Sequence, residues 1–473
     1  METARPLCID LDGTLVHTDL LVESALALLH RNPLYAFCFI AWLLRGKARL
    51  KAEIAKRVVL DVSLLPYNHA LTEWIAEHGK GRQVTLVTAS DATLAKAVAG
   101  HLGIFSTVMA SDGTLNLAGK RKAQALVEHF GERGFDYAGN HRVDLDVWKH
   151  AHTAIVVSSS HTLAGQAGKV AQATIALPTL RPTLRTWAKA LRVHQWLKNT
   201  LVFIPWLASH RLFDTAAATH AIAAFFCFSF CASGVYLLND LLDLDADRAH
   251  RSKKHRPFAA GRLSLVYGLV GVPVLTVAAF VLAILATPPA FAIVLAAYLA
   301  VTLLYSFKAK AIAGLDVMLL AGLYTVRIVG GTFAIISPLS FWLLAFSMFI
   351  FLSLAILKRC VELGALVASG KEKAKGRGYV ASDLALILPM GVASGYLSVL
   401  VLALYINSNA SMALYRKPEF LWLACPCLLY WVTRAWLVAH RGKMQDDPIV
   451  FAVTDRVSQI TLAIAGVLVL LAV

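Results

Sequence analysis

Charged residues are scarce in this chain. Asp, Glu, Lys and Arg make up only 16% of the 473 residues, whereas 58% are hydrophobic, and the apolar residues concentrate after about position 197. A bilayer crossing needs roughly 20 mostly apolar residues. We predict nine crossings, at approximately 197–213, 217–238, 263–286, 289–305, 312–335, 339–357, 383–405, 419–438 and 455–473.

Acidic residues are the scarcer of the two charges, 29 against 45 Lys and Arg, which gives a formal net charge of +16. The Lys and Arg residues are not spread as in a nucleic-acid-binding patch; they are concentrated in alternate loops between the predicted crossings. Predicted inside loops hold 17 Lys and Arg, and the outside loops hold only Arg211, Arg416 and Lys417. With the N-terminus taken as cytoplasmic, this distribution agrees with the positive-inside rule. We expect a multi-pass protein of a bacterial inner (plasma) membrane, with a cytoplasmic N-terminal domain and no nucleic-acid partner.

The chain also lacks cysteines at zinc-binding spacing and a leader-like start. Most of its seven cysteines lie in apolar runs, where they pack as small hydrophobic residues. The opening METARPLCIDLDGT has the pattern of a strand and not of a signal peptide, which begins with a charged and then an apolar stretch.

The N-terminal residues, about 1–180, alternate short apolar strands with charged helical stretches, as a soluble α/β domain does. Leu7–Leu15 reads LCIDLDGTL, an apolar strand that ends in two aspartates followed by a Gly-Thr turn. Open α/β sheets bind their ligands at the carboxyl ends of strands. Asp10 and Asp12 are therefore candidates for a catalytic site.

This stretch resembles the first motif of the haloacid dehalogenase superfamily, a Rossmann-like fold, and the later motifs follow in order. Residues 84–90 (VTLVTAS), 119–122 (GKRK) and 137–144 (YAGNHRVD) resemble the second, lysine and acidic motifs. The resemblance implies that Asp10 is the nucleophile and Asp12 the general acid/base. Thr88 would donate a hydrogen bond to a phosphate oxygen, and Lys122 would offset the phosphate charge. Asp10, Asp12 and Asp144 would contact Mg²⁺.

One position departs from that pattern. The family usually has Gly-Asp where this chain has Gly139-Asn140, so the resemblance lacks one carboxylate at the metal. The alternatives are that Asn140 coordinates through its carbonyl oxygen, that Mg²⁺ binds more weakly, or that the phosphatase is damaged. Residues 20–75 occupy the position of a small helical cap. Within it, 33–44 is an apolar dozen too short to span a bilayer; it is either a buried cap helix or a helix that touches the membrane. Two prolines, Pro178 and Pro182, mark the linker to a second domain, about 185–473.

The second predicted span is followed at once by a cluster of acids. On a helix at about 100° per residue, Asn239, Asp240, Asp243 and Asp247 share one face, and Asp245 points away. Hard oxygen ligands of this kind suit Mg²⁺, which binds through carboxylates and substrate phosphates. The alternatives are a solvated loop or salt bridges to Arg248 and Arg251.

This Asn-Asp-x-x-Asp-x-x-x-Asp pattern resembles the first signature of the UbiA superfamily of intramembrane prenyltransferases, whose polar loops hold a Mg²⁺-bound diphosphate. Secondary motifs resemble the branch that transfers phosphoribose from phosphoribosyl diphosphate to a polyprenyl phosphate. They are Gln195-Trp196 with Lys198-Asn199, Arg248 to Gly261, Tyr305 to Lys310 with Asp316, Arg327 before Gly330-Gly331, Lys358-Arg359 with Glu362, Arg377 to Tyr379, and Asp446-Asp447-Pro448.

The branch implies Asp240 and Asp243 as catalytic residues and, with Asp247, as metal ligands. A donor with a 5′-phosphate as well as a diphosphate needs additional cations. The candidate substrate-binding residues of this domain are Gln195, Lys198, Asn199, Asn239, Lys253, Arg256, Tyr305, Lys310, Arg327, Lys358 and Arg359. An arginine inside a span is costly and usually functional, although Arg327 has the alternative role of pairing with Asp316. The loop bases have the alternative role of orienting the protein or holding anionic membrane lipids.

Three functions remain open at this point. The first is Mg²⁺-dependent transfer of 5-phosphoribose to a polyprenyl phosphate, with a fused phosphatase that removes the 5′-phosphate of the product. The second is prenyl transfer from a prenyl diphosphate to an aromatic acceptor, of quinone or haem type. The third is a non-catalytic transporter or scaffold, against which the intact acidic motifs argue.

Overall fold

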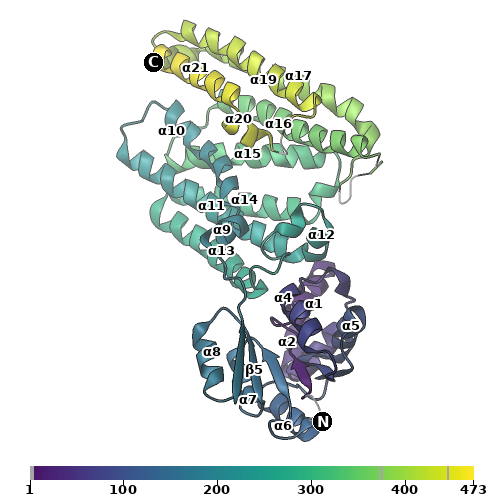
Figure 1. Cartoon of the computed structure of the whole chain (residues 1–473). Helices are drawn as coiled ribbons and strands as arrows, with labels where there is room; N and C mark the ends of the chain where they lie inside the picture. Colours follow the sequence, from purple (N-terminus) through teal and green to yellow (C-terminus); the bar gives the residue numbers. More distant parts are fainter. Residues whose placement is uncertain (1–4, 371, 374–376, 445–446) are drawn as a thin grey trace. The chain divides into compact units, whose positions relative to one another are not determined.

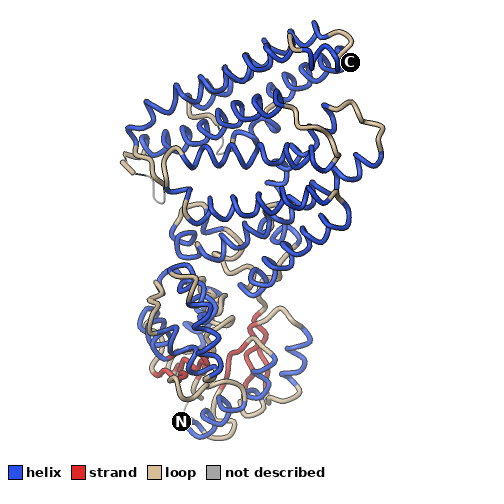
Figure 2. Tube along the Cα trace, turned by 180° about the vertical axis from the view of Figure 1, so that it is seen from behind, coloured by secondary structure: helices blue, strands red, loops and turns tan. Residues whose placement is uncertain are grey.

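The computed structural model describes residues 5–370, 372–373, 377–444 and 447–473. The chain divides into two compact units, Met1–Arg192 with Tyr236–Pro273 and Val193–Val235 with Val274–Val473. The predicted division at the 180–185 linker did not include the grouping of 236–273 with the N-terminal residues. Figure 2 shows that strands occur only in the N-terminal part and that the rest of the chain is helical.

The N-terminal unit contains a six-stranded parallel sheet in the order β3-β2-β1-β4-β5-β6. Leu7 of β1 is in register with Val84 of β2 and Asp136 of β4, so the strand that leads to Asp10 and Asp12 lies inside the sheet. The strands are β1 (Leu7–Ile9), β2 (Val84–Asp91), β3 (Thr107–Ser111), β4 (Asp136–Gly139), β5 (Thr153–Val157) and β6 (Ala173–Leu177).

Both faces of this sheet are buried, because successive side chains of a strand point to opposite faces. Leu7 and Ile9 belong to one apolar core, and Cys8 to the other. Helices α6 (Lys120–Phe130), α7 (Leu145–Trp148) and α8 (His161–Gly168) cover the Cys8 face, and Figure 1 shows them beside β5. The other face packs against α5 (Ala92–Leu102) and the cap.

The predicted cap is helical. It consists of α1 (Leu20–Arg31), α2 (Tyr35–Leu44), α3 (Lys47–Ala55), the 3-10 turn η1 (Val62–Leu64) and α4 (His69–His78). Asp19 begins α1, since its carboxylate accepts a hydrogen bond from the Val22 amide. After the sheet come η2 (Arg142–Asp144) and α9 (Leu184–Ala190), and residues 236–273 add α12 (Leu244–Ala249) and η4 (Lys253–His255).

Seven helices in the described residues are long and apolar enough to cross a membrane, or eight if one bent pair counts as a span. The predicted α/β domain with a helical cap, followed by an all-helical membrane domain, is therefore confirmed. The spans are α11 (Thr215–Leu242), α13 (Leu265–Ala286), α14 (Pro289–Phe307), α15 (Leu315–Ala334), α16 (Phe341–Ala368), α17 with η6 (Ala381–Ile406) and α19 with η7 (Pro418–His440).

The predicted span 197–213 is not one helix. The structure has a 3-10 segment, η3 (Val193–Phe203), then the short α10 (Ile204–Ala208), which begins with a proline at its first turn, and a turn at His210 with φ +54°. Lys198 and Asn199 are buried in this segment. Because these polar side chains need protein partners, the segment packs within the bundle and does not run through lipid.

The last predicted span, 455–473, is part of a bent pair, α20 (Pro448–Thr454) and α21 (Arg456–Ala472), whose axes differ by 77°. Asp455 at the break accepts a 2.8 Å hydrogen bond from the Ser458 amide and pairs with Arg434. Within this unit α15, α16 and α19 share one apolar core, and Figure 1 shows α16, α17 and α19 running alongside one another. The unit also contains η5 (Ala309–Ala311) and α18 (Asn409–Leu414).

Candidate active sites

The first candidate site lies at the carboxyl end of β1. Asp10 is held there because its amide donates to the Ala138 carbonyl of β4 at 2.9 Å. Gly13, at φ +73°, lets the chain turn directly after the two aspartates, and a methyl group at this position would overlap the Asn140 amide. The turn therefore brings Asn140 against the two-aspartate loop.

Asp10, the predicted nucleophile, belongs to a buried chain of polar groups. Lys122 donates to Asp10 Oδ1 at 2.7 Å and to the Tyr137 hydroxyl at 2.9 Å, and that hydroxyl donates to Asp144 Oδ1 at 3.1 Å. Burial acts to lower the pKa of Lys122, but the charges of Asp10 and Asp144 outweigh it, so the pKa is raised. The lysine thus stays protonated beside the nucleophile.

Asp12 has the environment of a proton donor. Its Oδ1 accepts a hydrogen bond from the Leu20 amide at 2.9 Å, and its Oδ2 accepts one from the Ser90 hydroxyl at 2.5 Å. Burial raises the pKa of Asp12 to about 7, and the charge of Asp19 acts in the same direction. A carboxyl group that titrates near neutral pH suits general acid/base work.

Thr88 and Asp144 occupy supporting positions. Thr88 is buried at the end of β2, where its hydroxyl oxygen accepts a hydrogen bond from the Ser90 amide at 3.0 Å; the hydroxyl can still donate its own proton. Asp144 Oδ2 accepts from the amides of Asn140 and His141 at 3.0 and 2.8 Å. Burial, followed by the Asp10 charge, raises the pKa of Asp144 to about 6.

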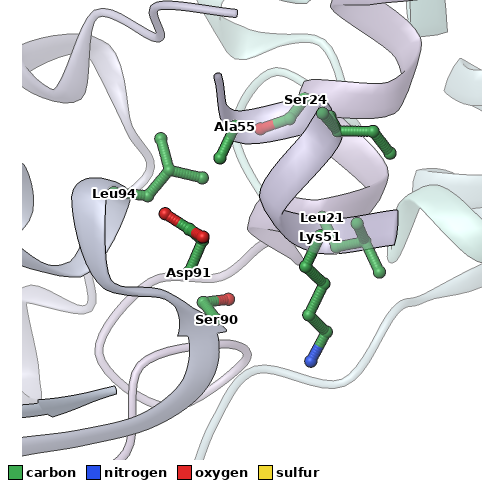
Figure 3. Close-up of a pocket in the computed structure, with 8 residues that line it drawn as sticks. Leu21, Ser24, Lys51, Ala55, Ser90, Asp91 and Leu94 are labelled. Carbon is green, nitrogen blue, oxygen red and sulfur yellow. The ribbon is translucent and has the colours of Figure 1, made fainter. Parts of the chain in front are cut away.

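A small hollow, about large enough for one water molecule and open to solvent, adjoins this site. Figure 3 shows Lys51 of α3 extended on one side of it, with Ser90 and Asp91 on the other. The Lys51 amine donates to the Ala89 carbonyl at 2.6 Å and to Asn116 Oδ1 at 3.0 Å. The remaining lining is mostly apolar, namely Leu21, Ser24, Ile54, Ala55 and Leu94.

The protein side chains at this site supply only part of a Mg²⁺ coordination shell, and phosphate oxygens of a substrate would supply more of it. In the described residues no three His, Cys, Asp or Glu side chains form a ready-made metal cluster. Asp10 and Asp12 lie on one loop with the Asn140 amide beside it, and the Asp144 carboxylate, which accepts from two backbone amides, is joined to Asp10 through Tyr137 and Lys122. Mg²⁺ is commonly held by one or two carboxylates plus phosphate oxygens and water, so the residues are compatible with it.

The second candidate site is the acidic segment after α11. The Arg256 guanidinium bridges Asp240 Oδ1 and Asp247 Oδ2, at 3.1 and 2.6 Å, and Arg192 also pairs with Asp240. Asp240 Oδ2 is buried and accepts no hydrogen bond within the described part of the chain. An orphaned carboxylate oxygen beside a second acid is a position that a cation fits.

The helix that carries these acids is interrupted. α11 ends at Leu242 and α12 begins at Leu244, with Asp243 between them, although the Asp247 amide still donates to the Asp243 carbonyl at 2.8 Å. Asp240 and Asp247 are buried and Asp245 is exposed, as the helical spacing predicts. Asn239 and Asp243 are half-buried and Lys253 is exposed in η4.

Arg248, considered from the sequence as a salt-bridge partner of the acidic motif, pairs with an acid of the cap. It forms a buried ion pair with Glu23 of α1, in which Arg248 Nη2 and Glu23 Oε2 lie 3.0 Å apart. Thr18 donates to the same Glu23 oxygen at 2.8 Å, and Arg248 Nε donates to the Ala259 carbonyl at 3.1 Å. The acidic segment is thereby attached to the first cap helix.

In the other unit, Arg327 is buried in α15. It donates from Nε to Asn199 Oδ1 at 2.7 Å and from Nη2 to the Tyr298 hydroxyl at 3.0 Å, and it also contacts the Leu323 carbonyl. All three acceptors are neutral. The proposed pairing of Arg327 with Asp316 is wrong, because Arg359 pairs with Asp316 at 3.0 Å and Tyr379 donates to that carboxylate at 2.7 Å.

The remaining predicted cations of this unit lie near acids. Asp447 pairs with Lys198 and, at 3.8 Å, with Lys358. Arg359 also contacts Glu362, and Tyr305 accepts a 3.2 Å hydrogen bond from Arg377. Gln195 and Lys310 are half-buried in η3 and η5, and Asp446 lies outside the described residues.

Sequence reasoning missed four contacting residues: Lys51, Ser90, Tyr137 and Arg192. Ser90 and Tyr137 lie inside motifs that were recognised, so proximity to those motifs was a usable signal. Lys51 comes from the cap and Arg192 from a segment about 50 residues before its partner. Nothing local in the sequence indicates either contact.

Comparison with known proteins identifies the family of the second half of the chain. Residues 199–454 match the UbiA prenyltransferase family. The uncharacterized protein y4nM of Sinorhizobium fredii is 37% identical over 461 residues, covering 96% of this chain and 88% of its own. The decaprenyl-phosphate phosphoribosyltransferase of Mycolicibacterium smegmatis is 32% identical over 280 residues, 58% of this chain and 87% of its own.

Solved structures align with each part. A UbiA homologue from Archaeoglobus fulgidus bound to GPP and Mg²⁺ covers 60% of this chain and 99% of its own, with a TM-score of 0.47 and 16% identity. Phosphoserine phosphatase in its apo form covers 36% of this chain and 92% of its own, with a TM-score of 0.26 and 17% identity. The chain belongs to the UbiA prenyltransferase family and is a multi-pass membrane protein, with an N-terminal α/β part built on a six-stranded parallel sheet.

Proposed function

We propose that the membrane domain transfers 5-phosphoribose from phosphoribosyl diphosphate to a polyprenyl phosphate. An oxygen of the polyprenyl phosphate attacks the anomeric carbon of the donor, and a new C–O bond forms. The bond from that carbon to the diphosphate breaks, and the diphosphate leaves with the electron pair. The proposal places the domain in a bacterial inner membrane with the N-terminal domain on the cytoplasmic side, where the basic loops are expected.

The observation that carries this proposal is the set of buried cations in the membrane domain, above all Arg327. Its three acceptors are neutral, so its charge is available to an anionic ligand. Lys198 is likewise buried, and Lys358 half-buried. A donor with two separate phosphate groups needs more cations than an isoprenoid diphosphate does.

Homology supports the same donor. The Mycolicibacterium smegmatis relative, 32% identical in an alignment that covers 87% of the relative's length, is named a decaprenyl-phosphate phosphoribosyltransferase. Asp240, Asp243 and Asp247 would hold Mg²⁺ with the diphosphate, and the ion would supply charge stabilisation for the leaving group. Arg256, which bridges Asp240 and Asp247 in this structure, is close enough to contact the same phosphates when they bind.

A two-substrate assay tests the proposal. The full chain in lipid nanodiscs receives polyprenyl phosphate and Mg²⁺ with labelled phosphoribosyl diphosphate, or an aromatic acceptor with labelled prenyl diphosphate. We expect label in the lipid fraction only in the first mixture. Label transferred only in the second mixture would assign the chain to aromatic prenyl transfer instead.

For the N-terminal domain we propose hydrolysis of the 5′-phosphate of the lipid-linked product. The Asp10 carboxylate attacks the phosphorus, the ester P–O bond breaks, and Asp12 gives its proton to the leaving oxygen. Asp12 then takes a proton from the water that cleaves the aspartyl-phosphate, which releases inorganic phosphate. Lys122, at 2.7 Å from Asp10, offsets the phosphate charge, and Thr88 donates to a phosphate oxygen.

This second step is tested on the phosphorylated lipid product itself. Purified full chain with Mg²⁺ is expected to release inorganic phosphate from it, and an Asp10→Asn variant is expected to release none. If the wild type leaves the 5′-phosphate unchanged, the fused domain has another substrate or is inactive, as the Asn140 departure would explain.

A further inference from the structure

Helix α2 (Tyr35–Leu44) is apolar on every side, yet the domain covers only one face of it. Tyr35, Phe39 and Trp42 pack against the core of the cap and sheet. Phe37 and Ile40 are 73% and 62% exposed, and no residue of the helix is fully buried. The alternative of a buried cap helix is therefore wrong. A helix that is apolar all round normally has both faces covered, so the exposed face of α2 needs a partner.

The exposed face is continuous. At about 100° per residue, Phe37, Ile40 and Leu44 lie within about 60° of one another. With Leu34 and Leu43 they supply five of the eleven exposed large apolar side chains among described residues 5–190. Single exposed apolar side chains are ordinary, but a cluster of this kind marks an interaction surface.

The charges around α2 are of one sign. Residues 31–52 contain five Lys or Arg and no Asp or Glu. Arg31 precedes the helix, and Arg45, Lys47 and Arg49 follow it; all four are exposed. An apolar face flanked by bases is complementary to a membrane surface with anionic headgroups.

Helix α2 begins a few residues after a contact with the end of a candidate span. His30, at the end of α1, lies with Nδ1 2.6 Å from the carbonyl oxygen of Leu242, the last residue of the span α11. Leu34 follows His30 by four residues, which reach at most about 14 Å when fully extended. The headgroup layer adds roughly 5–8 Å beyond each side of the hydrocarbon core. The apolar face is thus within reach of lipid.

We propose that α2 lies in the membrane interface with Phe37, Ile40 and Leu44 in lipid, and that it holds the phosphatase site over phosphomonoesters carried by membrane lipids. α3 begins three residues after α2 and carries Lys51 into the hollow beside Ser90 and Asp91. The link to catalysis rests on the proposed phosphatase function; the membrane contact of α2 does not.

The contact is measured with a nitroxide at Phe37→Cys, in the full chain reconstituted in nanodiscs containing anionic lipid. Cys38→Ser and Cys427→Ser remove the two cysteines that are not buried. We expect the label to be more accessible to oxygen than to a water-soluble nickel chelate. The same label at Glu128→Cys, on the exposed side of α6, is the aqueous control.

Either of two results would overturn the membrane contact. Greater accessibility to the nickel chelate places the helix in water. Protection from both reagents places it against protein, a second copy or another chain. This measurement needs no turnover, so it remains decisive if the proposed phosphatase function fails.

The catalytic consequence is tested with Phe37→Ser, Ile40→Ser and Leu44→Ser combined. Phosphate release from a lipid-linked phosphomonoester in the bilayer is expected to fall at least about tenfold, while hydrolysis of p-nitrophenyl phosphate stays unchanged. Leu115→Ser, another exposed apolar position, is the matched control. Equal losses on both substrates, or none on either, would contradict the proposal that α2 serves lipid-borne substrates.

Discussion

Two buried cations, Lys122 beside the two-aspartate loop and Arg327 in the membrane domain, are compensated in opposite ways. In the first, Lys122 meets Asp10 directly, and Tyr137 connects it to Asp144. In the second, the acceptors of Arg327 within the described residues are neutral oxygens of Asn199, Tyr298 and Leu323. A buried charge is costly unless it is paired, so the first site is organised before its ligand arrives, whereas the second depends on an anionic ligand for full compensation.

Removing the nucleophile should separate the two sites most completely. Asp10→Asn is expected to lower phosphate release by at least about 1,000-fold, since loss of a nucleophile removes the covalent route. Transfer of labelled phosphoribose to lipid should continue, and the product should keep its 5′-phosphate. Thin-layer separation of labelled lipids with and without that phosphate measures both activities; Asp112→Asn, at an exposed position, is the control. Equal loss of both activities would contradict separate sites.

Removing one partner of a buried ion pair should lower the free energy of unfolding more than removing one partner of a more exposed pair. Glu23→Gln leaves Arg248 buried without its carboxylate, and we expect destabilisation of about 3–5 kcal/mol. Trypsin cleavage after the exposed Lys253 and Lys254 reports the opening of that segment. Glu23→Met combined with Arg248→Met should restore wild-type resistance, because an apolar pair leaves no charge unpaired.

The exposed pair Arg211–Asp214 is the matched control for that experiment. Asp214→Asn should change stability by no more than about 1 kcal/mol. If Glu23→Gln is as resistant to trypsin as this control, the buried pair does not hold the acidic segment to the cap.

Replacing the planar guanidinium of Arg327 by an amine of the same charge should selectively weaken the binding of phosphoribosyl diphosphate. Arg327→Lys loses hydrogen bonds to a charged group, each of which contributes about 1.5–3 kcal/mol, or roughly 10- to 150-fold in kcat/KM for phosphoribosyl diphosphate. Phosphate release by the N-terminal domain should not change. Arg434→Lys, whose arginine pairs with Asp455, serves as the control. An unchanged kcat/KM would show that the arginine is structural.

The smallest effect concerns Asn140, whose amide lies against Gly13 in the catalytic loop. Asn140→Asp adds a carboxylate where the related phosphatases usually have one, and the Mg²⁺ concentration for half-maximal phosphate release should fall on the order of tenfold. Asn32→Asp, in the exposed turn after α1, is the control. A higher Mg²⁺ requirement would show that Asn140 is remote from the ion.

The sequence was most informative where function depends on local order. Asp10, Asp12, Thr88 and Lys122 were assigned from motifs; in the structure Lys122 contacts Asp10, and Ser90 hydrogen-bonds both Thr88 and Asp12. Strand alternation and the length of apolar runs were enough for the fold class. The 197–213 segment failed because hydrophobicity alone does not reveal that Lys198 and Asn199 have protein partners.

Contacts between distant segments were beyond sequence reasoning. Arg359, and not Arg327, pairs with Asp316, because the choice depends on how two helices are rotated. Glu23 and Arg248 are separated by 225 positions, and neither stands in a motif of the other. The exposure of α2 likewise depends on which face its neighbours cover, which an all-apolar stretch cannot indicate.

Helix α1 has three attachments along its length. Its first amide, at Leu20, bonds Asp12; Glu23 pairs with Arg248; and His30 contacts the Leu242 carbonyl. Splitting the gene at the Pro178–Pro182 linker would therefore cut the peptide chain but leave these contacts intact. We expect the two halves, expressed from separate genes, to co-purify, because the contacts of α1 do not depend on the linker.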